Sequence, residues 1–319
     1  VVASGLVSEL FSSDSDVQKV LAGYLVRVPL SYSGLGVCML MVSVCNALGL
    51  AMRALLVSTL RLFLCFLPLL WIVLLSFQPS GNILGNPLAF DGLTFDNYIN
   101  AIASLPLLRM YANTLLIAVV SVTIGTAISF MAAFALTRMV FRRKAQSSVR
   151  FYLLAGLAVP VYILLFPVYR LDLALGIFGT YWALILPYIA VTIPFNTLLM
   201  TGFLREFPSE IEEAAIIDGV GLWRLCWSVV LPLMRPVIAT LLIFNVVYVF
   251  NEFPFASILI NNPDMVTVSL AVSRFQGQYT VDYGGMMAAA TLVLLPQVII
   301  YALFQRQIIA GMTVGAVKG

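Results

Sequence analysis

Long apolar stretches recur along this chain and alternate with short polar segments. Each stretch approaches the roughly 20 apolar residues that a helix needs to cross the hydrocarbon layer of a bilayer. The stretches are apolar on all sides and lack the period-two alternation of membrane β-strands. The pattern predicts an all-α, polytopic transmembrane helix bundle. Its six core spans are expected at residues 62–77, 113–137, 151–169, 181–204, 237–260 and 286–304, the first with a start as early as residue 54.

Several prolines lie within the predicted spans. A proline inside a helix removes one backbone hydrogen bond, and in a membrane the freed carbonyl must find a partner on a neighbouring helix. We therefore expect kinks at Pro160, Pro167, Pro187, Pro194 and Pro254.

The N-terminal residues do not follow this pattern. Residues 1–19 are polar and rich in Ser and Asp, which predicts a flexible segment. Residues 34–50 are apolar but at the short limit for a span, so an extra membrane helix and a segment lying on the membrane both stay open. No basic start or small-residue cleavage site is present, so we do not expect a cleaved signal peptide. We divide the chain into an N-terminal segment, 1–55, and a transmembrane domain, 56–319.

Composition supports a body embedded in lipid. Of the 319 residues, 62% are hydrophobic and 10% are charged, and the mean hydropathy is +1.04. An average soluble domain is about 45–50% apolar and about 25% charged. A soluble protein of this size could not bury so much apolar surface.

The placement of Lys and Arg predicts an orientation. The loops after the second and fourth spans and the C-terminal tail together carry ten of these cations, whereas the opposite loops carry three. Short cytoplasmic loops of membrane proteins collect positive charge. We therefore expect a multi-pass protein whose C-terminus and two basic loops are cytoplasmic.

The sequence lacks the residues of common catalytic sites. It contains no His, its four Cys are scattered without metal-ligand spacing, and no Gly-x4-Gly-Lys-Ser/Thr phosphate-binding loop is present. We expect no metal, no cofactor and no enzymatic activity in this chain. If ATP drives the protein, another chain must bind it.

The segment between the fourth and fifth spans, 205–236, is far more polar than its neighbours. Ser209 and Glu212 have the spacing of a capping box, which predicts a helix start. The helix is expected over 211–218 and ends at Gly219, the residue best suited to a left-handed cap. A second short amphipathic helix follows and is expected to end at Leu231-Pro232, with Pro236 starting the next span. An ordinary capped loop helix is the plain alternative to a functional one.

The spacing within this loop is more specific than its composition. Glu213-Ala214-Ala215, three residues, Gly219, nine residues, Val229, one residue and Leu231-Pro232 resemble the EAA loop of binding-protein-dependent ABC importer permeases. Asp218 and Pro236 also match the common form, and Val229 stands where Ile is usual.

Further matches resemble the carbohydrate-uptake branch of that family, near the second permease subunit of the maltose type. Phe250-Asn251-Glu252-Phe253 is similar to its Trp-Asn-Glu-Phe, with Phe in place of Trp, and Asp282-Tyr283-Gly284 is similar to its Asp-Trp-Gly. The C-terminal residues from 304 onward are close to the terminal signature of these subunits. The resemblance covers about residues 61–319.

The resemblance implies a permease subunit of an ATP-driven sugar importer in the bacterial cytoplasmic membrane, forming half of the translocation pathway. The implied partners are a second permease, two ATPase subunits, an extracytoplasmic solute-binding protein and the lipid bilayer, but no nucleic acid. The first helix of the loop would be the coupling helix that docks in the ATPase, with Glu213 as its acidic contact. Trp223 and Trp227 would anchor the loop or pack beneath it. The matching coupling residues are Glu213, Ala214, Ala215, Asp218, Gly219, Leu231 and Pro232.

Polar residues inside membrane spans are candidates for a solute pathway. Amide and hydroxyl groups suit a sugar, whose hydroxyls need hydrogen-bond partners and whose ring faces stack on aromatic side chains. The same residues could instead form hydrogen bonds between helices, or the partner permease could supply the solute contacts. The candidates are Asn196, Asn245, Tyr248, Asn251 and Glu252.

Other classes of transporter stay open. An ABC permease could carry a non-sugar solute such as a glycerol phosphate or a polyamine. A secondary transporter would also be a helix bundle, but it would usually show inverted repeats and would have no reason for the spaced loop. A membrane enzyme would need a buried acid–base or metal constellation, for which only Asp and Glu remain.

Overall fold

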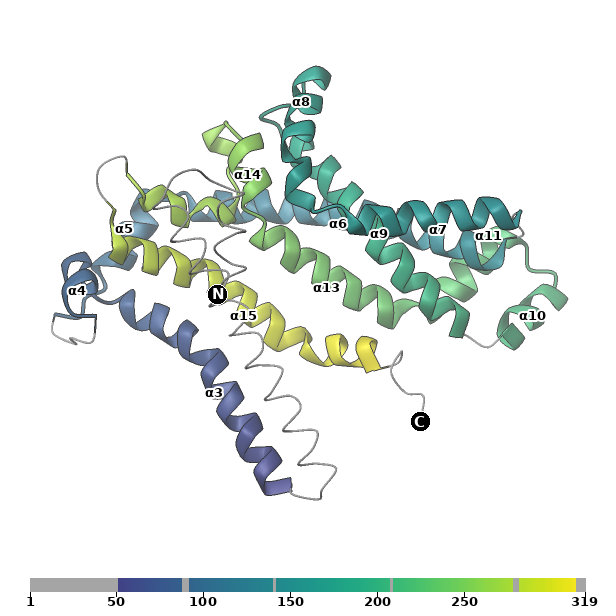
Figure 1. Cartoon of the computed structure of the whole chain (residues 1–319), viewed down its shortest axis with the longest axis horizontal. Coiled ribbons are helices and arrows are strands. Elements are labelled where there is room, and N and C mark those ends of the chain that lie inside the picture. The colour runs from purple at the N-terminus through teal and green to yellow at the C-terminus, as the bar shows by residue number, and fades with distance from the viewer. Residues whose placement is uncertain (1–50, 88–91, 140–141, 207–208, 278–280, 314–319) are drawn as a thin grey trace, which may run out of the picture. The chain divides into compact units, whose positions relative to one another are not determined.

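The computed structural model describes residues 51–87, 92–139, 142–206, 209–277 and 281–313 (Figure 1). The candidate extra helix at 34–50 and the last residues of the terminal signature lie outside the described residues. The chain divides into two compact units, Val1–Leu74 and Leu75–Gly319. In the first unit the structure describes one apolar helix, α3 (Ala51–Leu75), which covers most of the predicted first span.

The second unit is helical, and its described residues form no strand beyond one isolated bridge between Gln276 and Val281. This agrees with the predicted all-α fold class. In chain order the helices are α4 (Ser80–Gly85), α5 (Asp96–Ser104), α6 (Leu107–Arg138), α7 (Arg143–Ala158), η1 (Val161–Leu164), α8 (Leu165–Leu175), α9 (Trp182–Glu206), α10 (Ser209–Ile217), α11 (Leu222–Arg224), η2 (Leu225–Val230), α12 (Leu231–Leu233), α13 (Arg235–Asn251), α14 (Pro254–Leu259), η3 (Pro263–Met265), η4 (Val268–Leu270), η5 (Val272–Phe275) and α15 (Tyr283–Thr313).

Three helices of the described part are long and apolar enough to cross a membrane: α6, α9 and Tyr283–Leu303 of α15. They correspond to the predicted second, fourth and sixth spans. Two further helix pairs meet the same criteria together but are sharply bent, which gives up to five spans if each pair is one span. Pro187 and Pro194 lie inside α9, which continues through both.

The predicted third and fifth spans are wrong as single helices. Lys144–Ala158 and Val161–Leu175 meet at 91° around Pro160, which lacks a backbone donor and favours an extended residue before it. The fifth span does not continue to residue 260, because α13 ends at Asn251 and Glu252 is extended. Before α13, Leu222–Leu233 meets Arg235–Asn251 at 73°.

The most extensive helix packing joins α6 and α9. Gly125 of α6 makes this approach possible: a Cβ atom there would lie 2.7 Å from Thr192 Oγ1 and 3.7 Å from the Ile189 Cα. Distances below about 3 Å are not compatible with van der Waals contact, so only glycine fits without a shift of the Thr192 side chain. The two long helices therefore pack tightly against each other along their length.

The buried side chains form two clusters. The larger one packs α6 and α9 against α13, α14 and the segment 266–271, with Ile117, Leu184 and Phe255 among its fully buried members. The smaller one lies where α6 and α9 end and includes Phe130, Met200, Leu204, Cys226 and Met234. This second cluster supports the loop between α9 and α13, because η2 and the start of α13 contribute directly to it.

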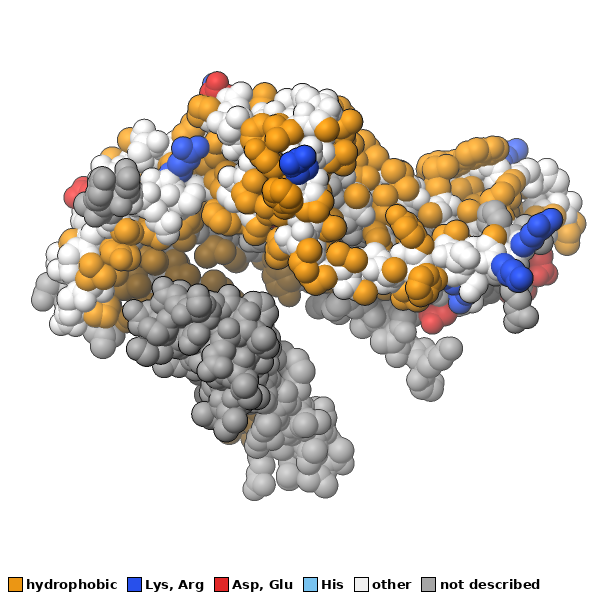
Figure 2. All heavy atoms as spheres, turned by 45° about the horizontal axis from the view of Figure 1, so that its top comes forward, with side chains coloured by type: hydrophobic (Ala, Val, Ile, Leu, Met, Phe, Trp, Pro, Cys, Tyr) orange, Lys and Arg blue, Asp and Glu red, His pale blue; other side chains and the backbone are white. Residues whose placement is uncertain are grey.

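Much of the surface is apolar. Large hydrophobic side chains are exposed along α6, α7, α9 and α15, for example Leu108, Tyr152 and Leu303. Figure 2 shows hydrophobic side chains over the middle of this face and charged side chains gathered toward the end where α10 and α11 lie in Figure 1. So much exposed apolar surface is typical of contact with lipid or partner subunits.

Candidate functional site: the loop between α9 and α13

Helix α10 ends in the left-handed turn that the sequence predicts. Gly219 has a φ of +77°, Val220 N–H donates to the Ala215 carbonyl at 3.0 Å, and Gly219 N–H donates to the Ile216 carbonyl at 2.9 Å. This arrangement satisfies carbonyls that the end of a helix leaves free. A Cβ atom at Gly219 would meet nothing within 4 Å, so backbone conformation, and not space, requires glycine here.

The predicted contact residues of α10 mostly face outward. Glu213, Ala214 and Asp218 are exposed, together with the apolar Ile217, which is 85% exposed. Ala215 instead packs against the smaller core cluster. The helix therefore presents an acidic and apolar face, and Ala215 packs it against the protein.

Glu212 has a partner that the predicted capping box does not include. Its side chain is buried and binds the guanidinium of Arg138, the last residue of α6. Arg138 Nε donates to Oε2 and Nη2 to Oε1, both at 2.6 Å, and Nη2 also donates to the Leu204 carbonyl of α9 at 2.8 Å. The capping box of Ser209 and Glu212 stays a prediction, because the side chain of Ser209 lies outside the described residues. The ion pair with a distant arginine is an additional contact of the Glu212 carboxylate.

Arg138 is a residue that the sequence analysis missed. It appeared only as one of several cations of a basic loop, and its partner lies 74 positions later. Nothing in the local pattern pairs the two. The sequence does contain one hint of a special role for Arg138. It is an arginine at the end of a long apolar helix, α6, where a positive charge also stabilises the helix dipole.

The second half of the loop is one bent helical stretch and not a helix that Leu231-Pro232 ends. α11, η2 and α12 continue through Pro232 to Leu233, and η2 is a π-helical turn. Pro232 lies in the first turn of α12, where the missing backbone N–H of a proline is tolerated. The bend follows at Met234, and Pro236 starts α13 as predicted. Leu231 itself packs on the smaller core cluster.

The two tryptophans of the loop differ. Trp223 is 68% exposed, whereas Trp227 packs beside Phe130 of α6, with 6.0 Å between ring centroids. A hollow of about 490 Å³ opens where the two halves of the loop face each other. It is lined by Arg138, Arg205, Glu212, Glu213, Ile216, Leu222 and Leu225.

The structure brings two of the pathway candidates together. Asn245 and Tyr248 of α13 line a hollow of about 290 Å³ with Val191, Thr192 and Phe195 of α9 and with Phe244. Asn196 lies one helical turn beyond Thr192 and is fully buried. Within the described part of the chain, the Asn196 amide, the Asn245 Nδ2 and the Tyr248 hydroxyl have no hydrogen-bond partner.

The other two pathway candidates lie outside this hollow. Asn251 is exposed and donates to Gln297 Oε1 of α15 at 2.8 Å. Glu252 is buried and accepts hydrogen bonds from the Phe255 and Ala256 backbone N–H groups at 2.8 and 3.1 Å. Glu252 therefore caps the start of α14, where the positive end of the helix favours a carboxylate.

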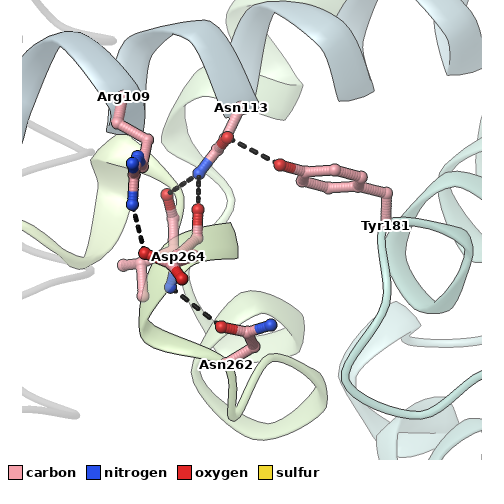
Figure 3. Close-up of polar contacts among 6 residues, drawn as sticks. Arg109, Asn113, Tyr181, Asn262 and Asp264 are labelled. Atoms are coloured by element: carbon pink, nitrogen blue, oxygen red, sulfur yellow. Dashed lines mark hydrogen bonds and ion pairs between the residues drawn. The ribbon is translucent and has the colours of Figure 1, made fainter.

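At the other end of α6, Asn113 holds the segment that follows α14 (Figure 3). Its Nδ2 donates to the carbonyls of Asp264 and Val266 at 2.9 and 3.0 Å, and its Oδ1 accepts from the Tyr181 hydroxyl at 2.8 Å. Arg109 pairs with the exposed Asp264 carboxylate beside it. These contacts fix α6, α9 and η3 to one another.

The Asp282-Tyr283-Gly284 motif serves the start of α15. Asp282 Oδ1 accepts from the Gly285 N–H at 3.0 Å and from the Ser80 hydroxyl at 2.6 Å. A Cβ atom on Gly284 would lie 2.7 Å from Asn97 Oδ1, so glycine is required by close approach. The motif joins α4, α5 and α15.

Apolar helices of spanning length, a largely apolar surface and an exposed acidic helix at one end are typical of a polytopic transport subunit. Residues 125–314 match the family model described as "Binding-protein-dependent transport system inner membrane component". The match covers more than half of the chain and includes the whole loop between α9 and α13. The chain belongs to this family and is a multi-pass protein of the inner membrane.

Curated relatives agree. The chain is 40% identical over 207 residues to a putative ABC transporter permease protein of Caldicellulosiruptor sp., covering 65% of this chain and 74% of the relative. It is 31% identical over 254 residues to the diacetylchitobiose uptake permease of Streptomyces coelicolor, covering 79% and 83%. It is 30% identical over 266 residues to the trehalose/maltose permease of Thermococcus litoralis, covering 82% and 95%. The predicted resemblance to importer permeases is confirmed.

Solved structures support the fold. A bacterial ABC transporter that imports alginate has a chain with a TM-score of 0.68 to this one and 17% sequence identity, covering 82% of this chain and 96% of that chain. The predicted fold class is confirmed by this likeness. A second structure of an alginate transporter, in complex with an alginate-bound periplasmic protein, gives a TM-score of 0.59.

Proposed function

We propose that this chain is one of two permease subunits of an ATP-driven carbohydrate importer, and that α10 is its coupling helix. The observation that carries the proposal is the exposed, acidic α10, closed by Gly219 and seated on the core cluster where α6 and α9 end. A partner can bind the exposed face of α10, and the core cluster beneath it can transmit force from α10 to the membrane helices α6 and α9. Glu213, Ala214 and Asp218 would contact the ATPase, and Ala215, Leu231 and Pro232 would hold the loop in shape.

The chemistry of the hollow between α9 and α13 favours a neutral solute. Its lining combines aromatic rings with the Asn245 amide and the Tyr248 hydroxyl and contains no charged side chain. Aromatic faces and uncharged polar groups suit a sugar ring, whereas a phosphate or a polyamine would require charge of opposite sign. The names of the diacetylchitobiose and trehalose/maltose permeases among the relatives support the same class of solute.

The proposed assembly contains this chain, a second permease, two ATPase subunits and an extracytoplasmic solute-binding protein. ATP hydrolysis resides in the ATPase subunits, and the binding protein confers most of the specificity. In this arrangement α10 and the C-terminus are cytoplasmic, in line with the basic loops. Among known complexes, the alginate transporter with its sugar-bound periplasmic protein supports the role of such a binding protein.

Co-purification tests the proposal. The tagged chain is isolated from native membranes in mild detergent, and the eluate is examined for partner subunits and ATPase activity. We expect a nucleotide-binding subunit, a second permease and ATP hydrolysis that rises with the binding protein and its sugar. Recovery of the chain alone, without ATPase in any detergent, would instead favour a secondary transporter.

A further inference from the structure

A buried ion pair joins the proposed coupling helix to two membrane helices. The guanidinium of Arg138, at the end of α6, forms two hydrogen bonds of 2.6 Å with the Glu212 carboxylate of α10. The same group donates to the Leu204 carbonyl of α9 at 2.8 Å. One side chain therefore connects α6, α9 and α10, and we call the pair Arg138–Glu212 the clamp.

The geometry makes the clamp rigid. The Arg138 and Glu212 side chains are only 17% and 9% exposed, so water screens their attraction weakly. A planar guanidinium that binds a carboxylate through two parallel bonds fixes orientation as well as distance. Removing one partner would leave a buried charge without compensation. In contrast to exposed ion pairs, this contact cannot exchange freely with solvent.

The clamp adds a direct polar connection to the apolar packing of Ala215 on the smaller core cluster. The backbone of α10 lies mainly against η2, whereas α6 and α9 pack extensively against each other. Arg138 reaches from the end of this rigid pair to the first turn of α10. A force applied to α10 can therefore pass directly into α6 and α9.

We propose that Arg138 and Glu212 are positioning residues that make α6 and α9 move with α10 as one rigid body. The inference rests on the proposed function of α10 as the coupling helix. Thr192 and Phe195 of α9 line one wall of the hollow, and Asn245 and Tyr248 of α13 line the other. Movement of α9 with α10 changes the access to that hollow. Without the clamp, only the packing of Ala215 and the short link to α9 remain, and the membrane helices follow α10 less closely.

The test measures movement at the hollow in the assembled complex. The four native cysteines are replaced by Ser, and Phe244→Cys is introduced as a reporter at the exposed edge of the hollow. The rate of its labelling by a water-soluble maleimide is measured with and without ATP plus vanadate. Co-purification of the ATPase is measured in parallel, so that docking and movement are recorded separately.

Two clamp variants are compared. Glu212→Gln weakens the pair, and Arg138→Met with Glu212→Met replaces both charges by apolar side chains, which avoids an unpaired buried charge and is expected to assemble. Arg142→Lys and Glu206→Gln are matched controls, because both residues are exposed near the same helix ends. We expect both clamp variants to retain the ATPase and to lose the difference in labelling that ATP produces, while the controls keep it.

Two results would overturn the inference and leave the proposed function in place. An ATP-dependent change in labelling that persists in the assembled double variant would show that movement reaches the hollow without the clamp. Loss of the ATPase from both clamp variants would show that the pair shapes the docking surface instead. If the parent complex with Phe244→Cys contains no ATPase or shows no response to ATP, the proposed function itself fails, and the inference fails with it.

Discussion

The hydroxyl of Tyr188 in α9 donates a hydrogen bond of 2.5 Å to the carboxylate of Glu252, between α13 and α14. The Glu252 carboxylate is buried and also accepts two backbone N–H groups of α14. A buried charge is stabilised only when donors surround it in this way. The contact explains the Glu of the Phe-Asn-Glu-Phe motif as a joint between two helices and not as a group that lines the hollow.

Loss of the Tyr188 hydroxyl is expected to weaken this joint. A hydrogen bond to a charged group contributes about 1.5–3 kcal/mol to stability. We expect Tyr188→Phe to lower the free energy of unfolding by an amount in that range, measured by thermal unfolding in detergent. Tyr301→Phe is the control, because Tyr301 is exposed on α15. Equal stability of the two variants would contradict the role given to Tyr188.

The approach of α6 to α9 gives a second prediction. Gly125→Ala places a methyl group against Thr192 Oγ1, which is itself bonded to the Tyr188 and Ile189 carbonyls at 3.0 Å and cannot turn away freely. Overpacking of this kind costs about 1–3 kcal/mol. Thermal unfolding should show this loss for Gly125→Ala and its recovery when Thr192→Ala is added. Gly202→Ala, with nothing within 4 Å in the interior of α9, should not lower stability, because Ala favours a helix over Gly.

The turn after α10 gives a third prediction. A β-branched residue at Gly219, where φ is +77°, adopts the left-handed region at a cost of roughly 1–2 kcal/mol or more. We expect Gly219→Val to reduce recovery of the ATPase with the tagged chain and Gly219→Asn to retain most of it, because Asn tolerates this conformation. Gly221→Val is the control, because Gly221 has a φ of −71° and open space around it. Equal recovery from both valine variants would exclude the conformational explanation.

Glu213 tests the docking face itself. The side chain is exposed, so Glu213→Lys should change the stability of the permease by no more than about 0.5 kcal/mol. The lysine should nevertheless repel a cationic site on the ATPase and lower the amount that co-purifies, most strongly at low salt. Glu206→Lys makes the same charge change outside α10. An undiminished ATPase yield from Glu213→Lys would remove Glu213 from the proposed contact.

Sequence reasoning predicted the fold class and the loop because both depend on local patterns. Run length and uniform hydropathy identify α6, α9 and α15, and the glycine at 219 marks a left-handed turn that the structure contains. The same reasoning failed where an apolar run continues through a break. Hydropathy does not change at Pro160 or between Asn251 and Pro254, although the helices end there. The prolines marked both places as predicted kinks, but not as ends of helices.

The contacts between distant residues could not be predicted from local patterns. Glu212 has the spacing of a capping residue, and only the folded chain brings Arg138 to it. Among the pathway candidates, helix period places Asn245 and Tyr248 on one face of α13, but the wall that α9 supplies depends on the packing at Gly125. One sequence carries no information on such pairings beyond residue type.

Asn113 and Arg109 lie four positions apart on α6 and both reach Asp264, yet they should differ in effect (Figure 3). The ion pair between Arg109 and Asp264 is 58% and 71% exposed, so Arg109→Ala should cost only about 0–1 kcal/mol. Asn113 is buried, and its removal leaves the Asp264 and Val266 carbonyls and the Tyr181 hydroxyl without their partner. At about 1–3 kcal/mol for each unsatisfied group, Asn113→Ala should be the more damaging change. Hydrogen exchange of residues 262–267 should accelerate in Asn113→Ala and remain near the parent rate in Arg109→Ala, and the reverse order would show that the exposed ion pair holds this segment.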